Sequence, residues 1–88
     1  MRLDKYLKVS RIIKRRTLSK EMADSQRVYV NGKVVKPSYK LSIGDEIQVV
    51  FGRREITVKV LQLKEHVLKD DSHLMYELIS DRKLEIEE

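Results

Sequence analysis

The sequence predicts an α+β fold, in which two short N-terminal helices precede mainly antiparallel strands and a helical C-terminal extension. Apolar residues recur at helical spacing in the first 24 residues, whereas apolar and polar residues alternate in residues 27–36 and again between residues 47 and 61. Asn31-Gly32 is the strongest two-residue hairpin signal, because a type I′ turn needs positive φ at both positions. With 88 residues, the chain is expected to form one domain.

The two N-terminal helices are predicted over residues 3–9 and about residues 16–24. In the first, two leucines four residues apart share a face, and an acidic residue in the first turn suits the helix dipole. In the second, Leu18 and Met22 are the expected buried pair. Both helices are too short to persist alone in water, so they must pack on the rest of the chain.

A β-hairpin is predicted next. The turn at Asn31-Gly32 places Tyr29 opposite Val34, and apolar residues on both sides continue the alternation. Pro37 ends the second strand, because its nitrogen cannot donate to a ladder.

Two further strands are predicted over residues 47–51 and 55–61, where apolar residues occupy alternate positions. Residues 37–46, which precede them, are expected to form a loop with two buried anchors, Leu41 and Ile43. Near the end of the chain, a serine followed by apolar residues four positions apart predicts a helix over residues 72–79.

Positive charge is concentrated at the start of the chain. Residues 1–40 contain 12 Lys and Arg against 3 Asp and Glu, a balance of +9, whereas residues 41–88 contain 7 against 11, a balance of −4. The net charge is +5. One part of this small protein is therefore suited to meet a polyanion, and the other is not.

The basic run Lys14-Arg15-Arg16 falls where the second helix should begin. A helix start exposes unpaired N–H groups that bind phosphate, and cations there oppose the helix dipole. Anion binding is one reason why the sequence contains a basic run that is unfavourable for the helix itself. The candidate contacts are Arg2, Lys5, Lys8, Arg11, Lys14, Arg15, Arg16, Lys20 and Lys33, with Arg27 and Lys36 as further members of the cluster.

The basic cluster is also compatible with two roles that involve no nucleic acid. A basic face keeps a small protein soluble, and a basic amphipathic helix can bind a membrane surface. Membrane binding is disfavoured, because the apolar residues of the first helix are needed for the core. We expect no membrane partner.

The residues that catalysis or cofactors require do not gather in this sequence. There is no cysteine, the three glycines are dispersed, and no nucleophile is grouped with a general base. His66 and His73 are interpreted as surface histidines. We predict a protein that is not an enzyme and binds no metal or cofactor. Without an apolar run long enough for a membrane span or a signal peptide, it is also expected to be cytoplasmic.

The motifs RLDKYL at residues 2–7, VYVNGK at 28–33 and LxxGDxI at 41–47 occur in an order that resembles the S4 (S-four) RNA-binding domain. The resemblance covers about residues 1–50. It implies that two short helices pack on a small, strongly bent sheet, and that the helix pair and the hairpin hold RNA. On this basis we divide the chain into an S4-type domain with a trailing hairpin, residues 1–61, and a C-terminal extension, residues 62–88.

The resemblance also ranks the candidate residues. Arg2 and Arg16 are the first choices for RNA contact, and Asp4 of the RLD motif is expected to orient Arg2 or a neighbouring helix. One position departs from the family, because Gln26 stands where glycine is frequent before the hairpin strand. If the backbone has positive φ there, Gln26 carries some strain.

The whole chain, from MRLDKYLKVSRIIKRRTL through FGRREITVKV, is similar to the heat-shock-protein-fifteen relatives of Gram-positive bacteria that act in ribosome-associated quality control. This resemblance implies binding to the large ribosomal subunit after the subunits separate. We expect the protein to be a monomer off the ribosome. It implies contacts with large-subunit ribosomal RNA and the P-site tRNA. It also implies support for a tailing factor that adds alanines to the stalled nascent chain.

Two alternatives remain from the sequence. The chain could serve as an RNA-binding module for an RNA-modifying enzyme such as a pseudouridine synthase. It could instead be a protein-interaction domain whose acidic half binds a basic partner.

Overall fold

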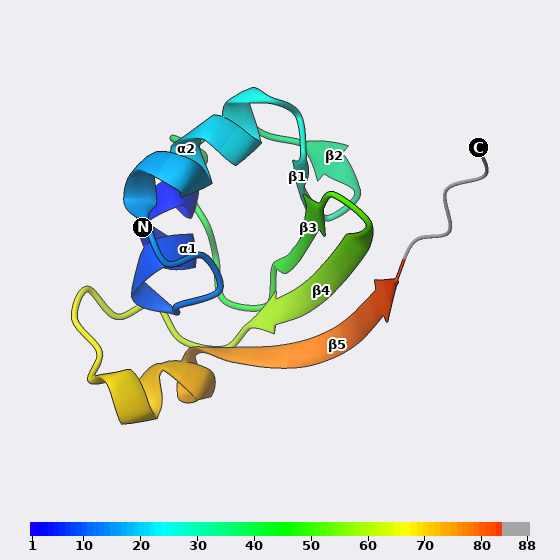
Figure 1. Cartoon of the computed structure of the whole chain (residues 1–88). Helices are drawn as coiled ribbons and strands as arrows, with labels where there is room; N and C mark the ends of the chain where they lie inside the picture. The colour runs from blue at the N-terminus through cyan, green and yellow to red at the C-terminus, as the bar shows by residue number, and fades with distance from the viewer. Residues whose placement is uncertain (84–88) are drawn as a thin grey trace, which may run out of the picture.

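A strongly bent antiparallel sheet and two short helices enclose the core in the computed structural model, which describes residues 1–83 (Figure 1). The sheet has five strands in the order β2-β1-β3-β4-β5, and every neighbouring pair is antiparallel. In chain order the elements are α1 (Leu3–Val9), α2 (Arg16–Asp24), β1 (Val28–Val30), β2 (Lys33–Val34), β3 (Glu46–Phe51), β4 (Arg54–Val60), the 3₁₀ helix η1 (Lys69–Met75) and β5 (Tyr76–Lys83). The predicted α+β class is confirmed.

The core lies between the helices and the inner face of the sheet. α1 buries three side chains completely, at positions i, i+3 and i+4, which is the face that the leucine spacing predicts. The strands contribute alternate residues, as a sheet with one buried face requires. The fully buried apolar side chains are Leu3, Tyr6, Leu7, Val28, Ile47, Val49, Val58, Val60 and Met75.

α2 has the predicted bounds but buries a different face. Met22 is buried as expected, together with Ser19 and Ala23, whereas Leu18 is 44% exposed. The prediction for Leu18 was wrong because the buried face follows positions 19, 22 and 23, which places residue 18 beside it. Ser19 is tolerated in the core because its hydroxyl donates to the Arg15 carbonyl at 3.2 Å.

The predicted hairpin is confirmed in its turn and its register. Tyr29 pairs with Val34, and both turn residues have positive φ, 51° at Asn31 and 83° at Gly32. Asn31 also joins the hairpin to the start of β3, since its side-chain oxygen accepts from the Glu46 N–H at 3.0 Å and its amide donates to Asp45 at 3.1 Å. This side chain therefore fixes a tertiary contact as well as a turn.

The loop before β3 contains one buried anchor, not two. Leu41 is buried as predicted, but Ile43 is 67% exposed. Residues 42–45 form a tight turn in which the Ser42 N–H donates to the Asp45 carboxylate at 2.8 Å and the Asp45 N–H donates to the Ser42 carbonyl at 3.1 Å. Ile43 lies at the tip of this turn, so its side chain points away from the core.

The C-terminal extension differs most from the prediction. The extension contains a helix, η1, but the bounds expected for it, residues 72–79, were wrong, because η1 ends at Met75 and β5 pairs along the whole of β4. The apolar spacing is compatible with a helix, but the free edge of β4 offers a full set of backbone hydrogen bonds. Pairing across that edge outweighs the weak local preference. The predicted extension runs to residue 88, and its residues 84–88 lie outside the described residues.

Candidate nucleic-acid interface

One buried carboxylate organises the N-terminal arginines. The Asp4 side chain is only 4% exposed, and it accepts a hydrogen bond from the Lys5 N–H at 2.8 Å. Arg2 donates to both carboxylate oxygens, through Nε at 3.2 Å and Nη2 at 3.3 Å. Arg16 Nε forms an ion pair with the second oxygen at 3.6 Å. The expected orienting role of Asp4 is confirmed, and it extends to two guanidinium groups.

Both arginines remain available to a ligand. Arg2 and Arg16 each have a half-exposed side chain, and Asp4 contacts only part of each guanidinium fork. A guanidinium group has five N–H donors, so the donors that Asp4 does not bind can engage a phosphate. The trio therefore presents two oriented cations that are fourteen residues apart in the chain.

The two helices begin in different environments. The first N–H groups of α1 are covered by the loop before β3, because the Leu3 N–H donates to the Tyr39 carbonyl at 2.8 Å and the Asp4 N–H donates to the Pro37 carbonyl at 3.1 Å. α2 begins at Arg16 with no side-chain cap and no acidic residue in its first turn. The residues around this start, Lys14 to Thr17, are all exposed. The predicted placement of the basic run at a helix start is confirmed.

The other candidate residues on the helices fall into two groups. Lys20 is exposed one turn beyond Arg16 on α2, next to the basic run. Lys8 and Arg11 lie at the end of α1, beside a shallow hollow that His66 also lines. Lys5 forms an ion pair with Glu65, so part of its charge is neutralised within the protein.

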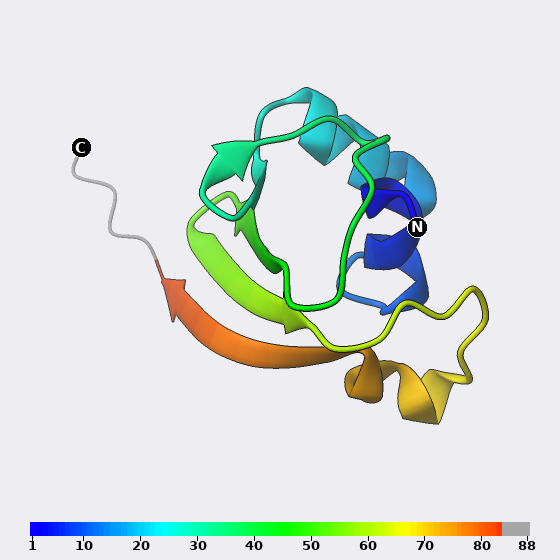
Figure 2. The ribbon, with the colours of Figure 1, turned by 180° about the vertical axis from the view of Figure 1, so that it is seen from behind.

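Lys33 is separate from the helix-borne cations. It is exposed in the β1–β2 hairpin. The helices and strands are arranged in a ring, and this hairpin lies on the side of the ring opposite α1 (Figures 1 and 2). A ligand that contacts both α1 and Lys33 must therefore span the molecule.

The sequence interpretation did not find the ion pairs of the C-terminal half. Arg54 binds Asp81 through two hydrogen bonds of 2.8 and 2.5 Å, and Arg82 binds both oxygens of Glu55 at 3.2 and 3.3 Å. The hydrogen bond from Arg54 lowers the pKa of Asp81, and the same bond raises the pKa of Arg54. These partners meet only because β5 pairs with β4, so no short sequence motif marks them.

Within residues 1–83, no group of three or more His, Cys, Asp or Glu side chains is arranged to hold a metal ion. None of the helices in this part of the chain has the length and apolar composition needed to cross a bilayer.

The sequence of residues 1–47, more than half of the chain, matches the S4 domain. The chain belongs to the S4 domain family. The S4 match and the relatives described below together identify it as a non-catalytic RNA-binding factor, and the resemblance found in its motifs is confirmed.

Relatives of nearly the same length support this membership. The chain is 52% identical over 85 residues to a Streptococcus pneumoniae protein named "RQC P-site tRNA stabilizing factor", and the match covers 97% of each chain. A Bacillus subtilis protein of the same name is 49% identical over 84 residues, which covers 96% of this chain and 98% of that one.

The fold is also that of a solved relative. Heat shock protein 15 from Vibrio cholerae, whose structure is described as trimeric, superposes with a TM-score of 0.84 at 28% identity. The superposition covers 91% of this chain and 82% of that chain. The shared fold thus extends well beyond the 47 residues of the S4 match.

Proposed function

We propose that this S4 protein binds the large ribosomal subunit, contacts ribosomal RNA and the P-site tRNA, and thereby supports ribosome-associated quality control. In this proposal it aids a tailing factor that adds alanines to stalled nascent chains, and it acts in the cytoplasm. The names of the two relatives, at 52% and 49% identity over nearly the whole chain, support the tRNA and quality-control parts.

The observation that carries the proposal is the pair of arginines held by Asp4. A buried carboxylate that orients two half-exposed guanidinium groups reduces the entropy that each loses when it binds a phosphate. The basic run at the start of α2 adds charge beside this pair. The proposed RNA-binding residues are Arg2, Lys5, Lys8, Arg11, Lys14, Arg15, Arg16, Lys20 and Lys33.

Co-sedimentation with purified large subunits, with and without P-site tRNA, tests the proposal. We expect binding that weakens steeply as salt rises, because phosphate contacts release counterions. Bound tRNA should increase the fraction that sediments. Arg16→Ala should lower affinity at least about tenfold, since charge-assisted hydrogen bonds of this kind are worth about 1.5–3 kcal/mol.

The matched control is Lys59→Ala, which removes one positive charge from an exposed position on β4. It should bind almost as tightly as the original protein. The free energy of unfolding of both variants should stay within about 1 kcal/mol of that of the original protein, because Lys59 is exposed and Arg2 still donates to both oxygens of Asp4 when Arg16 is removed. Equal loss of binding in the two variants would show that only total charge matters and would contradict the site.

The oligomeric state is part of the proposal as well. We propose that the free protein is a monomer, which sedimentation of the isolated chain checks. A trimer in solution, as described for the Vibrio relative, would require that the proposed RNA surface be re-examined for burial between copies.

A further inference from the structure

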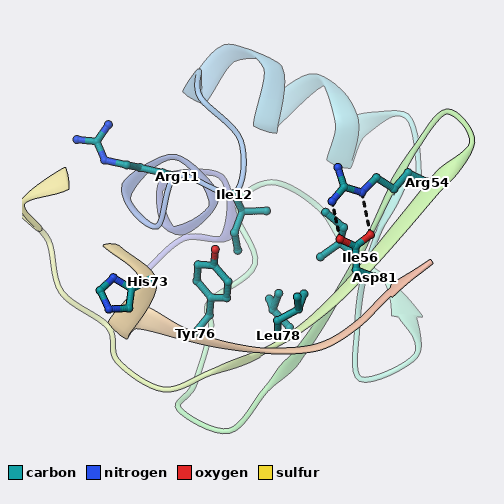
Figure 3. Close-up of a pocket in the computed structure, with 9 residues that line it drawn as sticks. Arg11, Ile12, Arg54, Ile56, His73, Tyr76, Leu78 and Asp81 are labelled. Atoms are coloured by element: carbon teal, nitrogen blue, oxygen red, sulfur yellow. Dashed lines mark hydrogen bonds and ion pairs between the residues drawn. The ribbon is translucent and has the colours of Figure 1, made fainter. Parts of the chain in front are cut away.

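A groove of about 420 Å³ lies between the β4–β5 pair and the connection from α1 to α2 (Figure 3). Its floor is apolar, formed by Ile56 and Val58 of β4 and by Leu78 of β5. Ile12, which follows α1, faces these side chains from the opposite wall. Tyr76 points from β5 toward Ile12. This groove is separate from the Asp4 site, and Arg11 is the one residue of its described lining that the function proposed above uses.

A β-bulge shapes the floor. Thr57 pairs with Ser80, but the next residue, Val58, pairs with Leu78, so Ile79 is an extra residue in β5. In a regular strand, residues 78 and 81 would point to opposite faces. Because of the bulge, Leu78 and Asp81 both line the groove, whereas Ile79 does not.

The groove carries charged and planar groups around its apolar floor. At one end, Arg54 is held in a bidentate pair by Asp81, so the only carboxylate among the described residues that line the groove is neutralised. At the other end stand Arg11 and the imidazole of His73. The guanidinium of Arg11 points outward from the rim, toward solvent (Figure 3).

Arg11 is held at this rim by an uncommon backbone conformation. Its φ is 62°, in the left-handed region that costs a residue with a side chain about 1 kcal/mol. Hydrogen bonds from the Arg11 N–H to the Lys8 carbonyl and from the Ile13 N–H to the Leu7 carbonyl, both 3.0 Å, hold the chain in this turn. The turn thereby directs Ile12 into the groove and leaves Arg11 at its mouth.

We propose that this groove receives one unpaired base of the bound RNA; the inference rests on the RNA-binding function proposed above. Unpaired bases stack on tyrosine, histidine and arginine planes, and Tyr76, His73 and Arg54 supply all three around the floor. The volume is within the range of small-ligand sites. A base in the groove leaves its phosphate at the mouth, where the outward guanidinium of Arg11 meets it.

The same observations disfavour a peptide strand in the groove. The backbones of β4 and β5 already pair with each other, so the floor offers no free ladder of hydrogen bonds to an incoming strand. A base has two apolar faces and needs polar partners only at its edge, which can stay at the open mouth. The positive rim also complements a phosphate.

Two RNA hairpins with the same stem test the proposal. One carries a single unpaired adenosine in the stem, and the other has an abasic residue at that position, so the phosphates match and only the base differs. The protein should bind the first hairpin about 5-fold to 100-fold more tightly, the range expected of one stacked base. The methyl resonances of Ile12 and Ile56 should shift with the first hairpin and not with the second.

The matched variants are Leu78→Glu and Ile79→Glu. The two residues are adjacent and similarly exposed, at 54% and 48%, and the charge change is the same, but only Leu78 lines the groove. Leu78→Glu should abolish the preference for the hairpin with the base. Ile79→Glu should keep that preference, even if both variants bind RNA more weakly overall.

The outcomes separate the two proposals. If the original protein binds both hairpins equally and Leu78→Glu behaves like Ile79→Glu, the groove proposal fails while RNA binding stands. If neither hairpin binds and the protein also fails to co-sediment with large subunits, the proposed function fails and the groove proposal fails with it. Equal binding of the hairpins, with loss of large-subunit binding in Leu78→Glu alone, would assign the groove to a protein partner and overturn the inference.

Discussion

Asp4 is the residue on which the geometry of the helix surface depends. It is nearly fully buried, yet its two ion-pair partners, Arg2 and Arg16, come from outside α1 and remain half exposed. Hydrogen bonds to a charged group contribute more than neutral ones, because the carboxylate is a stronger acceptor. Asp4 therefore stabilises the fold and positions the arginines at the same time.

Asp4→Asn keeps the shape of this side chain and removes its charge. We expect the free energy of unfolding to fall by about 1–2 kcal/mol, the difference between charge-assisted and neutral hydrogen bonds, in urea titrations. Asp24→Asn is the control, since Asp24 is exposed at the end of α2. Equal changes in both variants would show that Asp4 contributes no more than a surface charge.

Tyr6 connects α1 to the C-terminal extension. Its hydroxyl donates to the Met75 carbonyl at 2.6 Å, and this carbonyl also accepts from the Leu61 N–H at 2.9 Å. Burial raises the pKa of Tyr6, and the nearby Tyr76 raises it further. The folded protein therefore holds the phenol proton more tightly than the unfolded chain does.

The sign of the pH effect follows from this difference. The contribution of Tyr6 to stability is complete below about pH 10, the ordinary pKa of tyrosine, and is lost as the pH rises above it. Tyr6→Phe should cost about 1 kcal/mol at pH 7 through the lost hydrogen bond and should weaken the alkaline decline. Urea unfolding between pH 7 and 11 measures both effects, with Tyr39→Phe as the exposed control.

At the scale of elements, the end of α2 explains why the fold tolerates Gln26 at a position where glycine is frequent in the family. The Gln26 N–H donates to the Ala23 carbonyl and the Arg27 N–H donates to the Met22 carbonyl, both at 3.0 Å, which is a Schellman motif. Gln26 has a φ of 61°, so the condition under which strain was expected at this position is met. The hydrogen bonds hold a conformation that glycine would adopt at lower cost.

Gln26→Gly should therefore stabilise the protein by about 1 kcal/mol, because the left-handed conformation no longer strains a side chain. Thermal unfolding measures the change. Gln26→Ala is the control and should give no such gain, since alanine has the same Cβ. A gain in both variants would place the cause in the side chain of Gln26 and not in its backbone.

The extension shows where local pattern and tertiary pairing compete. The sequence of residues 72–79 fits a helix by apolar spacing, yet residues 76–83 form a strand against β4. The cross-strand ion pairs Arg54–Asp81 and Glu55–Arg82 join residues 27 apart, and a strand is the arrangement that brings them together. The predictions that Leu18 and Ile43 are buried were wrong for a related reason, since hydrophobicity alone does not specify which side of an element faces the core.

At the scale of the whole molecule, charge is divided between the two halves. The two arginine–carboxylate pairs of β4 and β5 are closed within the C-terminal half, whereas the basic run before α2 is exposed. The exposed basic run on the helices is therefore the part of the surface that the proposal assigns to RNA phosphates. The exposed cations were predictable because charge is visible in the sequence, but only the structure shows that Arg16 shares Asp4 with Arg2.

Neutralising two of these cations tests the division. For Lys14→Gln with Arg15→Gln, the slope of the logarithm of RNA affinity against the logarithm of salt concentration should fall by about 1.8, if each residue contacts one phosphate of duplex RNA much as in B-form DNA. Lys64→Gln with Lys69→Gln removes the same charge from exposed residues of the extension and should change the slope much less. Equal slopes for the two double variants would refute a localised RNA surface.

The order of residues was sufficient to predict the two helices, the type I′ hairpin, the charge division and membership of the family. The helices and the hairpin turn depend on residues close together in the chain, the charge division depends on composition, and family membership depends on the order of the motifs. All three are visible in the sequence. The folded arrangement was needed to show that Asp4 holds Arg16, that Tyr6 reaches Met75 and that β5 pairs with β4 around a bulge. Such contacts join residues 12 to 69 positions apart. The entropy lost in closing loops of this length is offset only when all the contacts of the folded chain form together.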